Sequence, residues 1–297
     1  MKLAAIDIGS NAARLLITDV FHDKKKQPEF IKSNLIRVPL RLGFDVFDTG
    51  EISPQKEEHL VQTIKAYKHL LNAYEIKNVK ACATSAMRDA KNSAAIIKRI
   101  RKETSVDIKI ISGDSEASLI YETHIAETLE KDILYLYIDV GGGSTELTFF
   151  LNGEVVFKQS FNIGTIRLLK QQVTELQWEE MKTVIRAQVK GAKKVMTIGS
   201  GGNINKVFSL SKRKEGKPIP LALLRDFYKE MNSLSIKERM SLYKMREDRA
   251  DVIVPALLIY VNVLKWADAA EILIPKIGLA DGLIHALYDE IIKKALE

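Results

Sequence analysis

The sequence predicts an α/β protein of two related halves, each with a mixed β-sheet flanked by helices. Apolar strand patterns alternate with helical patterns along the chain, which is typical of sheets covered by helices. The segment LAAIDIGSNAARLLITDV at 3–20 also has a counterpart, LYLYIDVGGGSTELTFFL at 134–151. These copies lie about 130 residues apart, so they indicate two related domains rather than a solenoid.

Each copy predicts a strand, a tight turn and an antiparallel return strand. The first hairpin joins strands at 2–8 and 14–20, and the second joins strands at 133–140 and 146–150. The other predicted elements are a helix at 55–74, a strand at 79–83, a helix at 93–103, a strand at 107–111, a helix at 178–191, a strand at 194–198, a largely helical stretch at 221–266, a strand at 271–274 and a closing helix at 281–296. Segment 209–220, rich in Lys, Gly and Pro, predicts a long disordered loop.

Composition narrows the class of protein. The net charge of +7, from 45 Lys and Arg against 38 Asp and Glu, favours anionic partners such as phosphates and nucleotides. The single cysteine, Cys82, is expected in the core and fits a reducing cytoplasm. The sequence shows neither a secretory signal nor a long apolar stretch, so we expect a cytoplasmic protein that does not enter the membrane.

Several kinds of site are not supported by the sequence. It contains no GxxxxGK[ST] loop, no GxGxxG after a strand and no GxSxG elbow. Its five histidines show no metal-ligand spacing. The basic residues are dispersed, so a nucleic-acid partner is not expected.

The two hairpin turns are candidate phosphate-binding loops. Backbone amides in turns rich in Gly, Ser and Asn can converge on an anion. An ordinary hairpin turn is the alternative for either one alone, because Gly and Asn satisfy positive φ. The candidate phosphate-binding residues are Gly9, Ser10, Asn11, Gly141, Gly142, Gly143, Ser144 and Thr145.

Three acids flank these turns and are candidate metal ligands. Asp7 and Asp139 each end an apolar strand, and Glu146 follows the second turn. Carboxylates at such positions can hold Mg2+ beside bound phosphates. The alternative is that they cap the turns through hydrogen bonds to backbone amides.

Two further side chains are candidates for catalysis. Glu116 is predicted in the first turn of a helix, where it acts as a general base or merely caps the helix. Arg88, in a polar turn after a strand, can clamp a phosphate or form an ion pair with Asp89.

One more Gly-rich turn stands between a strand and a helix. Its residues Gly199, Gly201, Gly202 and Asn203 are candidates for binding an anion or a nucleotide.

Six segments together resemble the exopolyphosphatase / guanosine pentaphosphate phosphohydrolase (Ppx/GppA) family. They match its signatures in order and spacing over most of the chain: DIGSNAARLL at 7–16, ATSAMRDAKN at 83–92, ISGDSEASLIY at 111–121, DVGGGSTEL at 139–147, IGSGGNINKV at 198–207 and DRADVIVPALLI at 248–259. This family belongs to the actin and sugar-kinase superfamily.

The resemblance implies two actin-like (ribonuclease H-like) domains with duplicated mixed β-sheets flanked by helices and an active-site cleft between them. We expect one domain over 1–123 with the C-terminal helix 281–297, and the other over 124–280. The resemblance also implies that Glu116 is the catalytic glutamate, that Arg88 contacts phosphate, and that Asp139 and Glu146 hold the divalent metal.

The resemblance implies a Mg2+-dependent (or Mn2+-dependent) exopolyphosphatase acting on inorganic polyphosphate, with guanosine pentaphosphate (pppGpp) as the alternative substrate. A catalytically weak nucleotide or polyphosphate sensor remains a third hypothesis, and a homodimer is compatible with the family. Two places depart from the pattern: Ala12 lacks the usual hydroxyl, and the C-terminal segment 278–283 has Leu where the family usually shows Arg-Glu-Gly.

Overall fold

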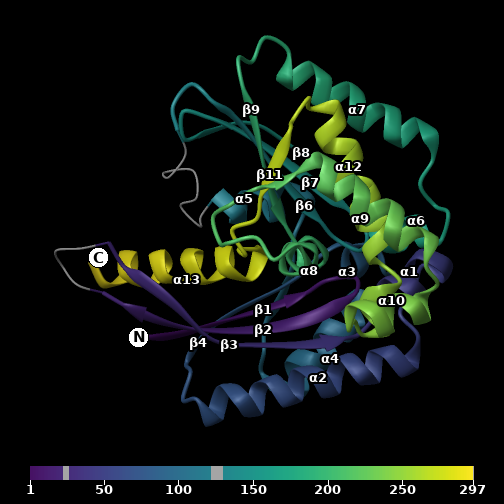
Figure 1. Cartoon of the computed structure of the whole chain (residues 1–297). Helices are drawn as coiled ribbons and strands as arrows, with labels where there is room; N and C mark the ends of the chain where they lie inside the picture. Colours follow the sequence, from purple (N-terminus) through teal and green to yellow (C-terminus); the bar gives the residue numbers. More distant parts are fainter. Residues whose placement is uncertain (23–26, 122–129, 297) are drawn as a thin grey trace. The chain divides into compact units, whose positions relative to one another are not determined.

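The computed structural model describes residues 1–22, 27–121 and 130–296. The chain divides into two compact units, coloured by sequence in Figure 1. We call Met1–Thr123 with Leu279–Glu297 the terminal unit and His124–Gly278 the central unit. The chain was expected to re-enter the first domain at residue 281, and it does so two residues earlier, at Leu279. The expected boundary between residues 123 and 124, and the last residue, 297, lie outside the described residues.

Both units alternate strands and helices. The terminal unit contains β1 (Lys2–Ile8), β2 (Ala12–Phe21), β3 (Glu29–Pro39), α1 (Leu42–Thr49), α2 (Pro54–Ala73), β4 (Asn78–Ala83), α3 (Ser85–Asp89), α4 (Ser93–Thr104), β5 (Ile108–Ile110), α5 (Gly113–Tyr121) and α13 (Leu279–Leu296). The central unit contains β6 (Leu134–Val140), β7 (Thr145–Leu151), β8 (Glu154–Phe161), α6 (Thr165–Leu169), α7 (Glu175–Val189), β9 (Val195–Ser200), α8 (Gly202–Ser211), β10 (Ile219–Pro220), α9 (Leu221–Ser233), α10 (Ile236–Tyr243), α11 (Glu247–Ala250), α12 (Ile253–Trp266) and β11 (Glu271–Leu273). None of the described helices is long and apolar enough to cross a membrane.

The two sheets repeat one topology. Within the described residues, the terminal unit has a five-stranded sheet in the order β3-β2-β1-β4-β5, and the central unit has the same order in β8-β7-β6-β9-β11, with β10 added at its edge. In both, the first three strands are antiparallel and the next two join in parallel. The hairpin registers also agree, since Ile8 pairs with Ala13 as Val140 pairs with Thr145. The repeat in the sequence therefore corresponds to a repeated structural unit.

The sheet of the terminal unit is covered on both faces. In Figure 1, α2 and α4 lie along one face and α13 along the other. Leu3, Ala5 and Leu16 pack with apolar residues of α13, such as Leu283 and Ile284. Burial of this apolar surface is the main force that holds α13, at the C-terminal end of the sequence, against β1 and β2, at its N-terminal end.

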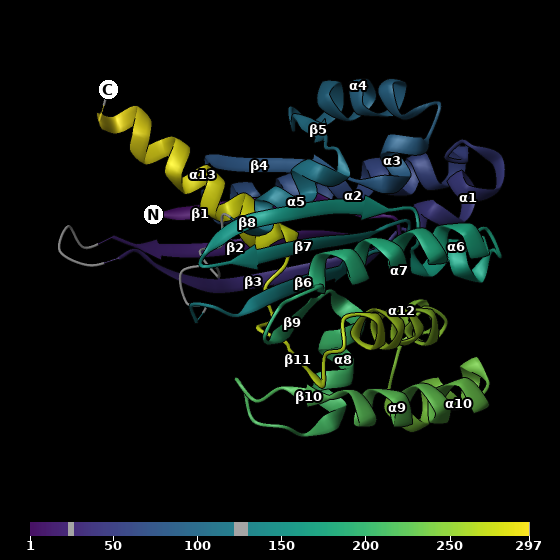
Figure 2. The same cartoon turned by 90° about the horizontal axis from the view of Figure 1, so that it is seen from above.

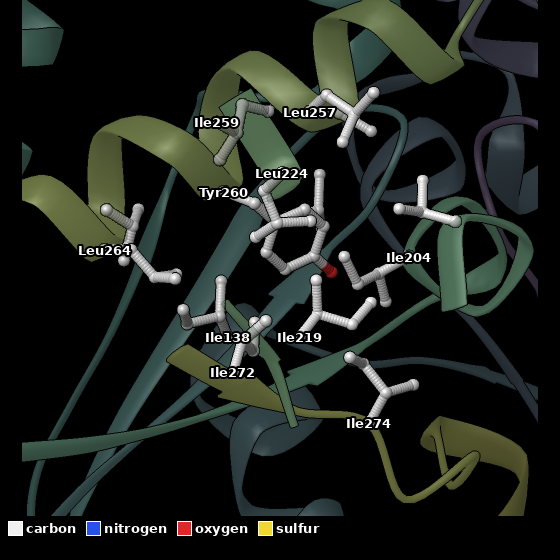
Figure 3. Close-up of a cluster of buried hydrophobic side chains, with 14 of the residues drawn as sticks. Ile138, Ile204, Ile219, Leu224, Leu257, Ile259, Tyr260, Leu264, Ile272 and Ile274 are labelled. Atoms are coloured by element: carbon white, nitrogen blue, oxygen red, sulfur yellow. The ribbon is translucent and has the colours of Figure 1, made fainter. Parts of the chain in front are cut away.

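The core of the central unit lies between its sheet and α12. Figure 2 shows α12 beside the sheet with α9 on its far side. In Figure 3, the Tyr260 ring of α12 lies among Ile138, Leu224 and Ile272, which come from β6, α9 and β11. This helix is apolar on most sides because it is buried by both neighbours.

Some elements differ from the sequence prediction. Strands β3 and β8 were not predicted, because both lie outside the hairpins with half-exposed polar residues that weaken the apolar alternation. Segment 209–220 is also not a continuous loop as predicted. Ser209–Ser211 finish α8, and Ile219–Pro220 pair with β11.

Replacing Gly282 by Ala is expected to destabilise the protein. A Cβ at Gly282 would lie 1.9 Å from the backbone oxygen of Leu119, so α13 and α5 would have to separate. We expect a loss of about 1–3 kcal/mol in chemical unfolding, although Ala is intrinsically the better helix former. Asp289→Ala, at an exposed position of the same helix, should change the unfolding free energy by less than about 0.5 kcal/mol. Equal stability of Gly282→Ala and the parent protein would contradict the close packing.

Candidate functional site

The first hairpin turn is held by its carbonyl groups. The amide of Gly43 donates to the Ser10 oxygen at 2.9 Å, and the amide of Arg41 donates to the Asn11 oxygen at 2.9 Å. Both donors lie where the chain passes from β3 to α1. Because the carbonyls of Ser10 and Asn11 already accept hydrogen bonds, the turn resembles backbone arrangements that bind anions through their amides.

The second turn is held in the same way. The carbonyls of Gly141–Gly143 accept, in order, from the amides of Thr165 and Ile166 and from Nε of Arg167, at 3.1, 2.8 and 2.8 Å. These donors follow β8 and begin α6. Within the described residues, the Gly142 and Gly143 amides donate no backbone hydrogen bond, which suits them to an anion.

Gly164 makes this arrangement possible. A Cβ there would lie 2.4 Å from the carbonyl carbon of Gly143 and 2.5 Å from the oxygen of Gly142. Only glycine lets the α6 segment approach the turn so closely. Gly164 was not predicted as a site residue, because nothing in the local sequence distinguishes it from an ordinary loop glycine.

The predicted hydroxyl donors have different roles. Ser10 Oγ accepts a hydrogen bond from the Ala86 amide at 3.2 Å, so its own proton is not used in that bond. Thr145 Oγ1 instead donates to the Ile163 oxygen at 2.5 Å, a bond that stabilises the turn. Ser144 is buried. Ser10 is therefore a better candidate than Thr145 for donating to phosphate.

Asp7 is buried and paired. Arg14 Nη1 lies 2.9 Å from Asp7 Oδ2, and the two residues are direct partners across β1 and β2. Burial raises the pKa of Asp7, and the charge and hydrogen bond of Arg14 oppose that rise. Asp7 remains a predicted metal ligand, but its negative charge is already balanced by a guanidinium group.

Glu116 lies in the first turn of α5, as predicted. Ser112 Oγ accepts from the Ser115 amide at 3.1 Å, so the serine, rather than Glu116, caps the helix through its side chain. Glu116 itself is 8% exposed. Burial, followed by the charges of Asp7 and Glu116, raises the pKa of Cys82 well above its ordinary value.

Arg88 connects two of the signature segments. Its Nη1 donates to the Ile111 oxygen at 2.8 Å, which joins the turn after β4 to the segment entering α5. A guanidinium group has five N–H donors, so the arrangement suits the predicted contact with phosphate.

The central unit brings two acids together at the equivalent place. Asp139 and Glu146 are direct partners across β6 and β7, so their side chains emerge side by side on one face of the sheet. Glu146 is 1% exposed, and its Oε1 accepts from Ser160 Oγ at 2.8 Å. Ser200, on β9, is the partner of Asp139 on the other side. We call Ser160, Glu146, Asp139 and Ser200 the acidic row.

Tyr260 fixes one end of the acidic row. Its hydroxyl donates to the Ser200 oxygen, and burial followed by the charge of Asp139 raises the pKa of Tyr260 well above its ordinary value. A Cβ on Gly201 would lie 3.5 Å from Asp139 Oδ1 and 3.6 Å from the Tyr260 hydroxyl, so all three groups converge. From the sequence, Tyr260 was predicted only as part of an apolar helix, because its ring fits that pattern and only its hydroxyl reaches the site.

The glycines of 199–203 have packing reasons of their own. A Cβ on Gly199 would lie 2.7 Å from Cδ1 of Ile272, and Gly201 has a φ of 116°. Arg249 donates to the Gly202 oxygen, which joins the segments 198–207 and 248–259. These contacts account for the glycine pattern without a ligand, so nucleotide binding by Gly199, Gly201, Gly202 and Asn203 stays a prediction.

The acidic row fits a hard divalent cation. Two neighbouring carboxylates and a serine hydroxyl are the oxygen ligands that Mg2+ accepts, with water completing the coordination. The described ranges contain no group of three or more His, Cys, Asp or Glu residues arranged to hold a metal. Any cation here therefore depends on Asp139 and Glu146, and the predicted set that adds Asp7 stays untested.

Arg14→Gln is expected to destabilise the protein in a pH-dependent way. Without the guanidinium, the already raised pKa of Asp7 should rise further. A raised pKa in the folded state gives stability that is present at low pH and is lost as the pH rises through the folded value. We expect a deficit of about 1–3 kcal/mol in urea unfolding at neutral pH, narrowing towards about pH 4.

The matched control is the double variant Asp7→Asn/Arg14→Gln, which removes the titrating group. The difference in unfolding free energy between this double variant and the parent protein should not become smaller as the pH is lowered. A pH-independent deficit in Arg14→Gln alone would contradict the role given to the ion pair.

Comparisons with known proteins agree with this fold. An exopolyphosphatase from Cytophaga hutchinsonii superposes with a TM-score of 0.84 at 25% identity, covering 98% of each chain. A Ppx/GppA family member from Aquifex aeolicus gives 0.76 at 24% identity, covering 99% of this chain and 98% of that one. The fold is therefore the two-domain, actin-like α/β fold that the resemblance implies.

Similar sequences include a bifunctional 3-dehydroquinate synthase/phosphatase of Fusobacterium nucleatum, 35% identical over 57% of this chain and 26% of its own length. Exopolyphosphatase 1 of Mycobacterium tuberculosis is 29% identical over 58% of this chain and 48% of its own, so this chain spans less than half the length of either relative. Exopolyphosphatase 2 of the same species is 25% identical over 85% and 86%. Because residues 21–290 match the Ppx/GppA phosphatase family, the chain belongs to that family.

Proposed function

We propose that this protein is an exopolyphosphatase, which releases terminal phosphate from inorganic polyphosphate with the help of Mg2+ or Mn2+. The observation that carries the proposal is the second hairpin. There, two adjacent carboxylates precede and follow a glycine turn whose carbonyls are occupied. A cation and a phosphate can bind next to each other at such a place.

The substrate class comes from charge and from the relatives. Two turns with amides suited to anions, together with Arg88, offer several contacts to a chain of phosphates. Relatives from M. tuberculosis and C. hutchinsonii are described as exopolyphosphatases. The glycines of 199–203 have packing roles, so no contact among the described residues favours a nucleotide over a simple polyphosphate.

Glu116 is the proposed general base. Its carboxylate orients a water and accepts its proton while the water oxygen attacks the terminal phosphorus. The bond between that phosphorus and the bridging oxygen breaks, and the shortened chain leaves with the electron pair as its new terminal phosphate. Positioning and charge neutralisation dominate such reactions, so this base needs a fixed place more than an unusual basicity.

Asp139 and Glu146 are the proposed holders of the divalent cation. When bound, the cation neutralises charge on the phosphate oxygens and makes attack by water easier. Ser160 keeps Glu146 in position through its hydrogen bond to Oε1. On the other side of Asp139, the Tyr260 hydroxyl holds the end of β9 through its hydrogen bond to the Ser200 oxygen.

Glu116→Gln tests the general base. The amide keeps the shape of the buried side chain but cannot accept a proton, so phosphate release from polyphosphate should fall at least about 100-fold while polyphosphate binding persists. Asp114→Asn is the matched control, since Asp114 is an exposed acid in the same first turn. It should retain near-parental activity. Full activity in Glu116→Gln would remove Glu116 from the mechanism.

Glu146→Gln tests the metal ligands. Losing one of two carboxylates should raise the Mg2+ concentration required for half-maximal activity by about 10-fold or more. Ser160→Ala should have a smaller effect, because it removes only a hydrogen bond to the same carboxylate. An unchanged Mg2+ requirement in Glu146→Gln would contradict the assignment.

The substrate is tested by phosphate release from short polyphosphate, long polyphosphate and guanosine pentaphosphate in parallel. We expect the polyphosphates to be hydrolysed faster than guanosine pentaphosphate. Preference for guanosine pentaphosphate would place the protein in the other branch of its family's chemistry. Tight binding without turnover on all three would indicate a sensor instead of an enzyme.

A further inference from the structure

Ser200 has a buried hydroxyl that the proposed mechanism does not use. The residue is 1% exposed, and its Oγ has no hydrogen-bond partner within the described residues. Leaving a buried hydroxyl without a partner is destabilising, so such groups usually serve a ligand, a water or an ion.

The sheet register places this hydroxyl beside the two acids. Ser200 is the partner of Asp139 across β9 and β6, and Asp139 is the partner of Glu146 across β6 and β7. Partners in register share a face of the sheet, on strands about 4.8 Å apart. All three side chains therefore emerge in one line on one face.

The surroundings fix this line at both ends. Tyr260 holds the Ser200 backbone oxygen, and Ser160 holds Glu146 Oε1. Asp139 Oδ1 is directed towards the β9 end, since it lies 3.5 Å from the place a Cβ on Gly201 would take. The backbone of Ser200 and the carboxylate of Glu146 are thus held in place by neighbouring residues.

We infer that Ser200 Oγ is a third protein oxygen for the divalent cation held by Asp139 and Glu146. The inference rests on the proposed function, because it concerns the cation of that site. A serine hydroxyl ligates Mg2+ beside phosphates in other phosphate-binding loops, so the chemistry is ordinary. The same role explains why an unpartnered polar atom is kept next to two acids.

The equivalent position in the terminal unit supports the choice of variants. There Cys82 is the partner of Asp7 across β4 and β1, as Ser200 is the partner of Asp139. A thiol is thus accommodated at this place in the fold. Exchange of Ser200 for Cys should keep the fold while replacing a hard oxygen by a soft sulfur.

The experiment measures Mn2+ and Cd2+ binding by calorimetry, without substrate and without an activity assay. Ser200→Ala should weaken the Mn2+ Kd about tenfold. Ser200→Cys should weaken the Mn2+ Kd similarly but tighten Cd2+ binding at least about tenfold over the parent protein. In metal-free buffer, Ser200→Ala should melt no lower than the parent, because removing an unsatisfied hydroxyl does not remove an interaction.

Thr148→Val is the matched control. Thr148 Oγ1 is also buried without a partner among the described residues, and it lies on the same face of β7, two residues beyond Glu146. This variant should keep the parental Mn2+ affinity. If Ser200→Ala keeps that affinity within about twofold, or Ser200→Cys gains no Cd2+ affinity, the inference is wrong.

Glu146→Gln separates this failure from a failure of the proposed function. If the parent protein and Glu146→Gln bind Mn2+ equally, or neither binds it, the cation site itself is wrong. If Glu146→Gln loses Mn2+ while Ser200→Ala does not, the site stands and only the role of Ser200 is lost.

Discussion

Both halves of the molecule depend on the same arrangement of hydrogen bonds. In each half, the carbonyls of the first hairpin turn accept hydrogen bonds from the segment that follows the third strand. Arg41 and Gly43 supply the donors in one half, and Thr165–Arg167 supply them in the other. Because a carbonyl that is already bonded cannot face an anion, these contacts decide which side of each turn is left for phosphate. The two turns also position the acids beside them, Asp7, Asp139 and Glu146, and contact the first residues of α3 and α6.

The two halves have the same backbone topology but carry different charges at equivalent positions. Asp7 and Asp139 occupy the same strand position, but their hairpin partners are Arg14 and Glu146. One half therefore forms an ion pair that neutralises its acid, and the other gathers two negative charges that favour a cation. The divergence supports different proposed roles for the two halves. The proposed base and the proposed phosphate contact, Arg88, belong to the half with the ion pair, and the proposed cation site belongs to the half with the two acids.

The sequence predicted what depends on local pattern. Both hairpins, the helix start before Glu116 and the buried Cys82 follow from apolar periodicity and turn residues within short windows. Edge strands were missed because their exposed residues dilute that periodicity. Contacts between distant segments were missed for another reason, since the closeness of Gly164 to the second turn and the position of the Tyr260 hydroxyl arise only from packing. The partnership of Asp7 with Arg14 was within reach, because a hairpin turn fixes its register.

Anomalous diffraction from crystals soaked in Mn2+, recorded at the manganese edge, tests directly whether the cation binds in the central unit. We expect a peak bounded by Asp139, Glu146 and Ser200, and none at Asp7, where Arg14 supplies the positive charge. A peak at Asp7 with none beside Asp139 would contradict the division of roles between the two halves.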